Sequence, residues 1–460
     1  MVVRGAMAAA ESDFLAELGS WLRIPSVSAR PEYAMDVRRS AEWLCEALWR
    51  AGFPVAELWE TGGHPSVFAQ WPAADPAAPV ILVYGHHDVQ PVEAAEWDTP
   101  PFDPVRHGDE LFGRGAADDK GQVVAHLFAA RLANAASGGQ APPVTLKVLV
   151  EGEEESASPH LADLLRTHRD RLACDAVIVS DTPMLGPETP SICIGMRGLA
   201  DCEIDVFGPE GDIHSGSFGG GVPNPAHALA ELIAQMHDDK GRVTLPGFYD
   251  RVRPLSDDER AELARLPFDE ARWLRQSARS AAAIGEAGFS TLERIWVRPA
   301  AEVNGLWSGY TGPGSKTIIP RGAHAKISFR LVANQQPDEV ISSFREFVAD
   351  RLPTGVRAEV RGGGPGLRPC LTPADSPVLQ AAIRAVGGVF GADVLLTREG
   401  GSGPEADLAD VLGVPVVFVG FGLPDDRVHA ANERVVISRL LKGAEALAEL
   451  WLDLAERGRG

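Results

Sequence analysis

The chain has 460 residues, of which 45% are hydrophobic and 23% are charged, and its formal net charge is −21. This length exceeds that of one ordinary hydrophobic core and predicts two or three domains, or one domain that carries an insertion. The negative charge argues against nucleic acid or an anionic membrane as a partner, because both require a basic surface.

Cysteine usage and the N-terminus indicate the compartment. The five cysteines are odd in number, scattered and without a CxxC pair, which predicts reduced thiols instead of disulfides or a zinc knot. Glu11, Asp13 and Glu17 interrupt the N-terminal apolar residues, so no signal peptide is expected. The sequence also lacks an apolar run of about eighteen residues, the length that a membrane span needs. We therefore expect a soluble, cytoplasmic protein.

The N-terminal segment predicts two helices. Apolar residues recur at helical spacing from Phe14 to Leu22, and Pro25 closes this run. A second helix is expected around Val37 to Trp49.

Four short apolar runs then predict buried strands. They are rich in β-branched residues and lack polar alternation, as in a parallel sheet with helices on both faces. A helical stretch from about Gln122 to Ala136 lies between the first two runs, so the pattern is that of an α/β domain. The four runs are Val80 to Tyr84, Val144 to Val150, Ala176 to Val179 and Val414 to Val419.

The middle of the chain has a different pattern. Cys202 to Phe207 and Lys326 to Leu331 alternate polar and apolar residues, which predicts an antiparallel sheet with one exposed face. One helix is expected to begin at Asn224-Pro225, and another to run from Asp338 to about Leu352. The order strand, helix, strand, strand, helix, strand is that of a ferredoxin-like, split βαβ unit.

Glycine-rich stretches flank this middle block, and the α/β pattern resumes after it. We therefore expect a mostly parallel-sheet α/β domain over 1–197 and 368–460, with helices on both faces of its sheet. An inserted α+β domain is expected over 198–367. The helical segment near 257–286 carries no motif that indicates a function.

Residues of the types that commonly bind metals follow three of the predicted strands. His86, His87 and Asp88 follow the first, the acidic segment Glu151–Glu155 the second, and Asp181 the third. Ligands of open α/β sheets bind at the carboxyl ends of the strands, so these side chains are expected at one edge. Each alone is typical of a solvated loop, but together they indicate a metal site, because imidazole and carboxylate suit zinc, manganese or cobalt.

Residue parity separates the two adjacent histidines. In an extended strand His86 and Asp88 point to one side and His87 to the other. Asp88 is then placed to accept the second N–H of a metal-bound His86, and His87 is left as a packing residue. The segment 113–121 stays ambiguous on spacing alone: it is either a glycine-rich turn with acidic residues before a helix, or it carries a carboxylate shared by two metals.

Several motifs follow one another in a characteristic order from Ile24-Pro25-Ser26-Val27-Ser28 onward. They are His86-His87-Asp88-Val89-Gln90-Pro91, Trp97-Asp98-Thr99-Pro100-Pro101-Phe102, Gly113-Arg114-Gly115 with Asp118-Asp119-Lys120-Gly121, Glu151-Gly152-Glu153-Glu154-Glu155, and His429-Ala430-Ala431-Asn432-Glu433. This series resembles that of the M20 metallopeptidase family, and most closely its dipeptidase branch related to carnosinase and cytosolic nonspecific dipeptidase. The resemblance covers almost the whole chain.

The resemblance implies two divalent metal ions bridged by Asp118, with zinc expected first and manganese or cobalt as alternatives. His86 and Asp181 would also bind one ion, and Glu155 and His429 the other. In the family the peptide bond after the bridging aspartate is cis. A cis bond is therefore predicted after Asp118, although such bonds normally cost about 3–4 kcal/mol.

The resemblance also implies catalytic roles. Glu154 matches the general base that acts on a metal-bridging hydroxide, and Asp88 matches the carboxylate that orients His86. His214 matches a histidine that reaches into the active site of a partner subunit and stabilises the oxyanion, which implies a homodimer. The resemblance thus implies that the α/β domain is the catalytic domain and that the inserted domain serves as a lid and for dimerisation.

Four further residues match a substrate site. Asn304, Thr317 and Arg330 resemble the substrate clamp of the family, in which Arg330 would grip the C-terminal carboxylate of a peptide. Ser402 lies in a segment that resembles a glycine-rich loop that binds the substrate backbone. Without the resemblance, Arg330 would be interpreted as a surface arginine of a strand, and His214 as a loop histidine.

The function that these motifs favour is a dimetal peptidase acting on dipeptides or small peptides. The alternatives are a related N-acyl-amino-acid hydrolase or carboxypeptidase, which Arg330 fits equally well, and a noncatalytic binding module. The last requires loss of a ligand or of Glu154, and all of these residues are present. Ala157 is a mild departure from the family pattern. Gly403 and Glu405 stand where apolar residues are usual, which leaves the pocket shape and the substrate preference open.

Overall fold

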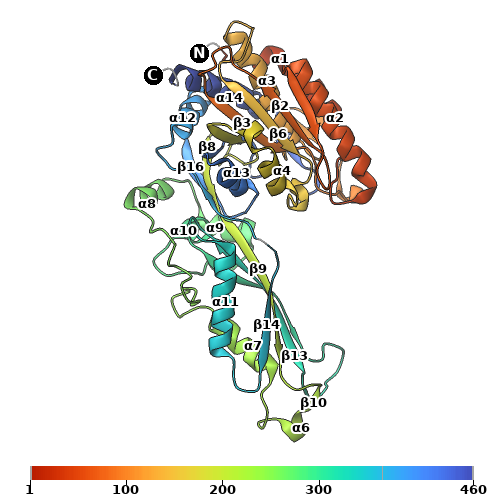
Figure 1. Cartoon of the computed structure of the whole chain (residues 1–460), viewed down its shortest axis with the longest axis vertical. Coiled ribbons are helices and arrows are strands. Elements are labelled where there is room, and N and C mark those ends of the chain that lie inside the picture. The colour runs from red at the N-terminus through yellow and green to blue at the C-terminus, as the bar shows by residue number, and fades with distance from the viewer. Residues whose placement is uncertain (1–2, 365, 458–460) are drawn as a thin grey trace. The chain divides into compact units, whose positions relative to one another are not determined.

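The computed structural model describes residues 3–364 and 366–457. These residues form two compact units (Figure 1). The first unit comprises the chain up to Ile194, Thr372–Thr397, and the chain from Asp407 onward. The second unit comprises Gly195–Leu371 and Arg398–Ala406. The segment Arg398–Ala406 thus belongs to the second unit, although it lies outside the range 198–367 expected for the insertion.

Strands of a nine-stranded sheet form the centre of the first unit, and one strand of this sheet, β15, falls within the residues of the second unit. The order of the sheet is β1-β2-β6-β3-β7-β17-β8-β15, and β16 also pairs with β8. The four central strands β6, β3, β7 and β17 are parallel and correspond to the four apolar runs, while the neighbouring pairs on each side are antiparallel. The predicted mixed α/β class is confirmed. The strands are β1 (Val55–Trp59), β2 (Ser66–Trp71), β3 (Val80–His86), β6 (Thr145–Glu151), β7 (Ala176–Val179), β8 (Ser191–Met196), β15 (Cys370–Leu371), β16 (Leu395–Glu399) and β17 (Val416–Phe418).

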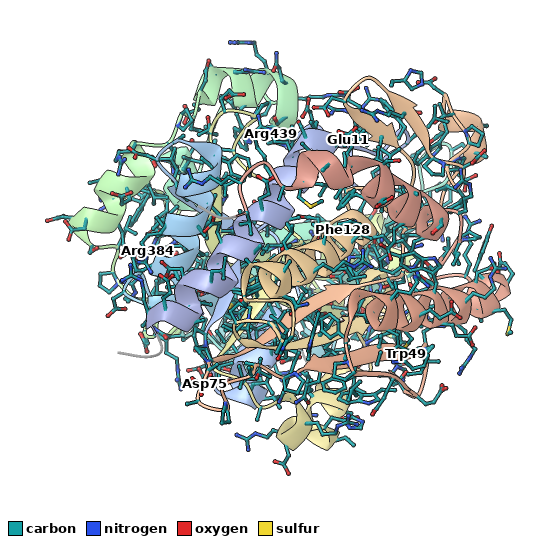
Figure 2. The ribbon with its side chains drawn as sticks, turned by 90° about the horizontal axis from the view of Figure 1, so that it is seen from above. Glu11, Trp49, Asp75, Phe128, Arg384 and Arg439 are labelled. Atoms are coloured by element: carbon teal, nitrogen blue, oxygen red, sulfur yellow. The ribbon has the colours of Figure 1, made fainter. Side chains whose placement is uncertain are left out.

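Helices cover both faces of this sheet. The helices α1, α2, α3 and α14 lie on one face, onto which Figure 2 looks down, and α4 and α13 lie on the other (Figure 1). Phe128 of α3 packs against Phe14 of α1 with ring centroids 5.1 Å apart, so the helical spacing of the N-terminal apolar residues does serve the core. The helices of this unit are α1 (Met7–Leu22), α2 (Ala34–Ala51), α3 (Lys120–Ala136), α4 (Leu161–Thr167), α5 (Arg169–Leu172), α12 (Pro377–Phe390), α13 (Glu405–Leu412) and α14 (Ile437–Arg457).

A small three-stranded sheet joins the C-terminal part of the chain to the segment before α3. It contains β4 (Val105–His107), β5 (Glu110–Phe112) and β18 (Arg434–Val436). The backbone N–H of Gly113 also donates to the carbonyl of Glu433, at 3.0 Å. These bonds bring two motifs together that are more than 300 residues apart in sequence.

The second unit is built on a four-stranded antiparallel sheet in the order β11-β13-β9-β14. Along the chain its elements follow the order β9, α7, β11, β13, α11, β14, which is the predicted split βαβ unit. Asn224 caps α7, its side chain accepting from the backbone N–H of Ala226, at 2.9 Å. The elements are β9 (Gly198–Phe207), α7 (Pro225–Ala234), β11 (Ala300–Ser308), β13 (Gly322–Leu331), α11 (Pro337–Arg351) and β14 (Arg357–Gly362).

Shorter elements complete the second unit. The segment without interpretable motifs folds mainly into short helices, and serine side chains form capping boxes at the start of α8 and α10. Across the described residues, no helix combines the length and apolarity that a membrane span needs, and all five cysteines are free thiols. The short elements are β10 (Ile213–His214), α6 (Ser215–Phe218), α8 (Asp257–Ala264), α9 (Glu270–Trp273), the π-helical turn η4 (Leu274–Ala278), α10 (Thr291–Trp296) and β12 (Ile318–Ile319).

Candidate metal centre

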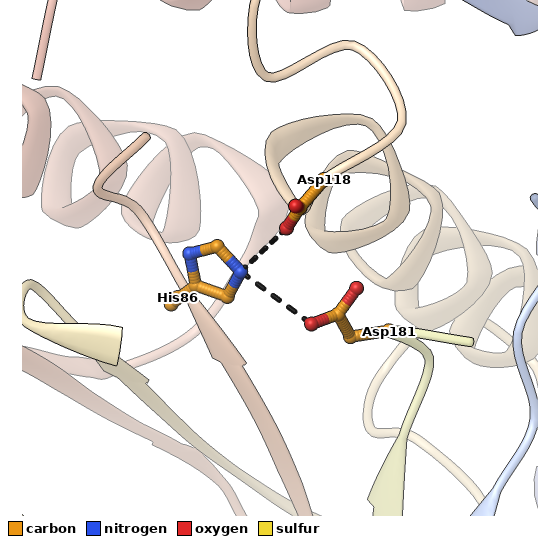
Figure 3. A group of neighbouring side chains, drawn as sticks. All are labelled: His86, Asp118 and Asp181. Carbon is orange, nitrogen blue, oxygen red and sulfur yellow. Dashed lines mark hydrogen bonds and ion pairs between the residues drawn. The ribbon is translucent and has the colours of Figure 1, made fainter. Parts of the chain in front are cut away.

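His86, Asp118 and Asp181 converge in the first unit (Figure 3). His86 ends β3, Asp181 follows β7, and Asp118 precedes α3. Because β3 and β7 are adjacent and parallel, their carboxyl ends meet at the same edge of the sheet. The Nε2 atom of His86 lies 2.8 Å from Oδ1 of Asp118 and 3.5 Å from Oδ2 of Asp181. The three side chains therefore face one point.

A second group shares Asp118. The Nε2 atom of His429 lies 3.0 Å from Oδ2 of Asp118 and 3.2 Å from Oε2 of Glu155. The two carboxylate oxygens of Asp118 thus face two different histidines. In each group the potential ligand atoms lie within 4.8 Å of one another, and the described part of the chain holds no third group of this kind. The peptide bond between Asp118 and Asp119 is cis, as predicted.

Asp88 connects His86 to the acidic segment. The Nδ1 atom of His86 lies 3.0 Å from the backbone carbonyl oxygen of Asp88 and 3.4 Å from its Oδ1. The carboxylate of Asp88 accepts from Ser28 Oγ at 2.6 Å and from the backbone N–H groups of Glu154 and Glu155 at 3.3 and 3.1 Å. Asp88 therefore orients one histidine and positions the backbone that carries two glutamates.

His87 points away from this centre, as parity predicts. Its ring is fully buried, and Nε2 lies 2.9 Å from the carbonyl oxygen of Pro65. Burial lowers the pKa of His87 to about 4, so the ring is neutral near pH 7. It acts as a packing residue beneath the strand end.

Glu154 is half-buried beside both groups. Burial raises the pKa of its carboxyl group to about 9; the charge of His86 opposes this shift, and the negative charges of Asp181, Glu155 and Asp118 add to it. A divalent cation bound nearby would lower this pKa again. Among the described residues no hydrogen bond occupies the carboxyl group of Glu154, which leaves it available for proton transfer.

A buried carboxylate from the C-terminal motif supports Asp118. Glu433 is fully buried, and its Oε1 accepts from the backbone N–H groups of Ala117 and Asp118 at 2.9 and 3.2 Å. Its Oε2 accepts from the backbone N–H of Gly115 at 3.0 Å and from Nη1 of Arg114 at 2.7 Å. One side chain thus fixes the segment on which the shared aspartate lies.

Two residues at the start of α3 hold the same segment. Lys120 is buried, and its Nζ donates to the carbonyl of Ile24 at 2.8 Å. Burial lowers the pKa of Lys120 to about 7. Gln122 donates to the carbonyl of Ala117 at 3.3 Å and accepts from the backbone N–H of Phe421 at 2.8 Å. The start of α3 is therefore held by hydrogen bonds from the buried polar side chains of Lys120 and Gln122.

The sequence offered little sign of these supporting residues. Glu433 closes the C-terminal motif, but its four hydrogen bonds reach backbone and side-chain groups more than 300 residues away. A stronger signal lies in Lys120 and Gln122, because long polar side chains open a helix that is buried through most of its length. A buried lysine or glutamine needs hydrogen-bonding partners, which indicates a structured site nearby.

The donor chemistry of the centre fits divalent cations. Burial raises the pKa of Asp181 and that of Asp119, and the negative charges of neighbouring carboxylates raise both further. The acidic groups therefore repel one another, and bound cations would offset that repulsion. Imidazole nitrogens and carboxylate oxygens are suitable ligands for zinc, manganese or cobalt.

Both candidate histidines are strong bases in the metal-free protein. Burial lowers the pKa of His86, but its contacts with Asp118 and Asp181 raise it more, to well above the ordinary value. Hydrogen bonds to Asp118 and Glu155 raise the pKa of His429 to about 10. A cation that binds here must displace these protons, so metal affinity should rise with pH.

In the second unit, the predicted substrate residues fall into two pairs and one single residue. Arg330 Nη1 donates to Ser402 Oγ at 3.0 Å. His214 and Thr317 are neighbours, because β10 pairs with β12 and the N–H that follows His214 donates to the carbonyl of Thr317 at 3.0 Å. Asn304 lies exposed on the edge strand β11, and no hydrogen bond within the described residues joins its side chain to the other four.

The ring of His214 is exposed but oriented. Its Nδ1 accepts from the backbone N–H groups of Gly216 and Ser217 at 2.9 and 3.2 Å. These bonds fix the tautomer, because Nδ1 must be unprotonated and Nε2 then carries the hydrogen. The outward Nε2–H is therefore a hydrogen-bond donor with no partner among the described residues of this chain.

The sequence profile described as Peptidase family M20/M25/M40 matches residues 82–453. The chain belongs to the M20/M25/M40 peptidase family. The resemblance that the motifs indicated is thereby confirmed, and the chain is a hydrolase of this family.

Curated relatives of the M20 chain are similar over almost its full length. The chain is 28% identical to the Beta-Ala-His dipeptidase of Homo sapiens over 464 aligned positions, which cover 97% of the chain and 91% of that protein. It is 31% identical to the Cys-Gly metallodipeptidase DUG1 of Candida albicans, with 94% of the chain and 93% of that protein covered. Both relatives are named as dipeptidases.

Solved structures show the same relationship. The M20 family metallo-carboxypeptidase Sso-CP2 from Sulfolobus solfataricus superposes with a TM-score of 0.81 at 31% identity, covering 96% of this chain and 99% of that one. The di-peptidase Dug1p from Saccharomyces cerevisiae gives a TM-score of 0.75 at 26% identity, with 98% and 97% covered. The M20 chain therefore shares its whole architecture with these enzymes.

Proposed function

We propose that this M20 chain is a dimetal dipeptidase that hydrolyses dipeptides or small peptides. The observation that carries the proposal is the pair of ligand groups that share Asp118, whose two carboxylate oxygens face His86 and His429 separately. Relatives that match nearly the full length of the chain and are named dipeptidases support the choice of substrate.

In this proposal His86, Asp118 and Asp181 hold one divalent cation, and Asp118, Glu155 and His429 hold the other. Zinc is the proposed metal, and manganese or cobalt would suit the same donors. When bound, the two cations supply a water of lowered pKa and an electrophilic contact for the scissile carbonyl oxygen.

The residues of the chain then move the protons. Glu154 takes a proton from the attacking water and returns it to the leaving amine, which is the role of a general base that becomes a general acid. Asp88 holds the Glu154 backbone N–H and faces the His86 ring, so it keeps base and ligand in fixed positions.

The second unit supplies substrate contacts in the same proposal. Arg330 binds the C-terminal carboxylate of the peptide as part of a clamp with Asn304 and Thr317, and Ser402 lies on the loop that binds the substrate backbone. His214 stabilises the oxyanion in the active site of a partner subunit, so the enzyme is a homodimer. Its outward Nε2–H, which lacks a partner in the described chain, supports this role.

An exposed apolar strip on the edge strand β11 supports the homodimer. Leu306 and Trp307 expose 57% and 44% of their surface, and the neighbouring Tyr310 exposes 48%. Exposed apolar side chains on a sheet edge are typical of surfaces that become covered by another chain. Analytical ultracentrifugation should therefore find a dimer, and a monomer at micromolar concentration would contradict this part of the proposal.

A carboxypeptidase is the second candidate, favoured by the similarity to a structure named as a metallo-carboxypeptidase. Both activities require a free C-terminal carboxylate, so Arg330 does not separate them. They differ in the length of peptide that the site accepts and in the need for a free amino group.

The test combines metal analysis with a substrate panel. The protein is stripped with chelator, reloaded with zinc, manganese or cobalt, and assayed on dipeptides, their N-acetyl forms, and tetrapeptides. We expect two metals per chain, no turnover without metal, and a preference for free dipeptides. Turnover of N-acetyl forms alone would indicate an acyl-amino-acid hydrolase, and stepwise cleavage of tetrapeptides a carboxypeptidase; either result would overturn the dipeptidase.

A further inference from the structure

Two arginines of the second unit lie on the same side of neighbouring strands. Arg330 on β13 pairs directly with Leu199 on β9. Arg197 is the single residue between β8 and β9, two positions before Leu199, so alternation along an extended chain would place its side chain on the same side. Diagonal neighbours across an antiparallel pair are within reach of long side chains. Arg197 and Arg330 are therefore placed close together, although they carry the same charge.

Both guanidinium groups bind the same short loop. Arg197 Nε donates to the carbonyl of Gly400 at 3.2 Å, and its backbone N–H donates to the carbonyl of Glu399 at 3.2 Å. Two residues further along, Ser402 accepts from Arg330 at 3.0 Å. A Cβ atom on Gly400 would lie only 3.1 Å from Nη2 of Arg197, so a glycine at this position leaves the guanidinium the space it occupies.

The two charges lack a carboxylate partner. Within the described residues neither Arg197 nor Arg330 forms an ion pair with an acidic side chain. Burial lowers the pKa of Arg197 to about 10, the charge of Arg330 lowers it further, and the exposed Glu302 opposes this shift. A guanidinium group in a protein carries a positive charge, and two half-buried like charges without a counterion are unfavourable.

Most of their hydrogen-bond donors are also unused. A guanidinium group has five N–H donors, and the hydrogen bonds of the described chain use one from each of these two side chains. A carboxylate is the anion whose planar pair of oxygens matches such donors. The loop beside them offers the hydroxyl of Ser402, and the space around Gly401 is open.

We propose that Arg197 and Arg330 together form the carboxylate site, each binding one oxygen of the C-terminal carboxylate of the substrate. The inference rests on the proposed function, which assigned this group to Arg330 alone. It adds Arg197 as a second substrate-binding residue and gives the two unpaired charges a common counterion.

The test compares a dipeptide with the same dipeptide ending in an amide. In Arg197→Met and Arg330→Met we expect KM for the free dipeptide to rise roughly 10- to 100-fold, with kcat and the weak turnover of the amide little changed. Arg197→Lys should recover part of the loss, because it keeps the charge but not the planar fork. Arg357→Met, on an exposed arginine of β14, is the matched control and should leave both substrates unaffected.

A binding measurement separates this inference from the proposed function. Calorimetry with N-acetylalanine and N-acetylalanine amide uses no catalysis, so it reports on the site even if no dipeptide is hydrolysed. We expect the acid to bind more tightly than the amide in the wild type, and this difference to disappear in both methionine variants. The inference is wrong if Arg197→Met keeps the wild-type preference for the acid over the amide while Arg330→Met loses it. It is also wrong if inorganic phosphate binds more tightly than the carboxylate. Thermal unfolding of each variant checks that the fold is retained.

Discussion

The candidate metal centre and the proposed substrate residues differ in how this chain supports them. Most residues of the candidate metal centre stand at or beside strand and helix ends, and most contact a second buried group, such as Asp88 beside His86 or Glu433 beneath Asp118. By contrast, His214, Asn304 and Thr317 are exposed on short or edge elements. In the first region hydrogen bonds within a single chain hold most of the side chains, whereas the second presents exposed hydrogen-bonding groups to solvent.

This difference has an energetic meaning. Buried polar groups must be satisfied inside the protein, so the metal centre required a network that fixes each side chain. An exposed donor such as His214 can be satisfied by water until a partner arrives. Substitutions of the candidate metal ligands and of the buried groups that support them should therefore alter metal binding and stability, whereas substitutions of the exposed residues should alter catalysis or substrate binding and leave the fold unchanged.

The largest effect is expected at the proposed base. Glu154→Gln should reduce kcat by about 100- to 10,000-fold, because the amide cannot accept a proton, while both metals stay bound. Turnover and metal content by mass spectrometry check this. The adjacent Glu153→Gln is a matched control, since that carboxylate binds His160 away from the centre. Undiminished hydrolysis in Glu154→Gln would show that another group is the base.

Loss of the exposed histidine should affect turnover without affecting the fold. His214→Ala is expected to lower kcat by about 100- to 1,000-fold, the usual effect of removing one oxyanion donor, with the melting temperature unchanged. Mixing it with Glu154→Gln subunits should restore activity toward about a quarter of the wild-type level, because half of the dimers then hold one intact site. No recovery after subunit exchange would contradict action across the interface.

Glu433→Gln tests the buried support of the metal centre. The amide keeps the shape but turns an NH₂ group toward the backbone donors of Gly115 or Ala117, and it loses the charge that faces Arg114. We expect metal affinity to fall about 10- to 100-fold, as for other residues that orient metal ligands, and stability to fall by about 2–3 kcal/mol. Calorimetric metal titration and urea unfolding measure the two effects. The exposed Glu93→Gln should change neither.

The central part of this arrangement could be predicted from the sequence. Strands buried on both faces read as continuous apolar runs, and the polar residues that follow them have to lie at one edge of the sheet. The short outer strands, such as β15 with two residues, give no such signal. The meeting of Asp118 with His429 and Glu433 depends on pairing across more than 300 residues, which neither periodicity nor spacing reveals. For that part only the resemblance was informative.

The smallest effect on activity is expected from a buried histidine of the first unit, whose contribution is to stability. His126 is buried on α3, with Nε2 2.7 Å from Ser180 Oγ, and burial lowers its pKa to about 3. Below about pH 6.5 His126 binds a proton in the unfolded chain but stays neutral in the folded chain. The free energy of unfolding therefore decreases as the pH falls from about 6.5 toward 3. By pH 4.5 the loss from this group should reach about 3 kcal/mol.

Replacing His126 isolates this contribution from the acidic metal centre. His126→Gln should be less stable than the wild type at pH 8, because it disturbs the packing and the bond to Ser180. Between pH 6.5 and 4.5 its free energy of unfolding should fall less steeply than that of the wild type, and urea titrations at each pH measure the difference. His107→Gln, at an exposed site on β4, should follow the wild-type slope. Equal slopes for His126→Gln and wild type would place the acid sensitivity of the first unit in its carboxylates instead.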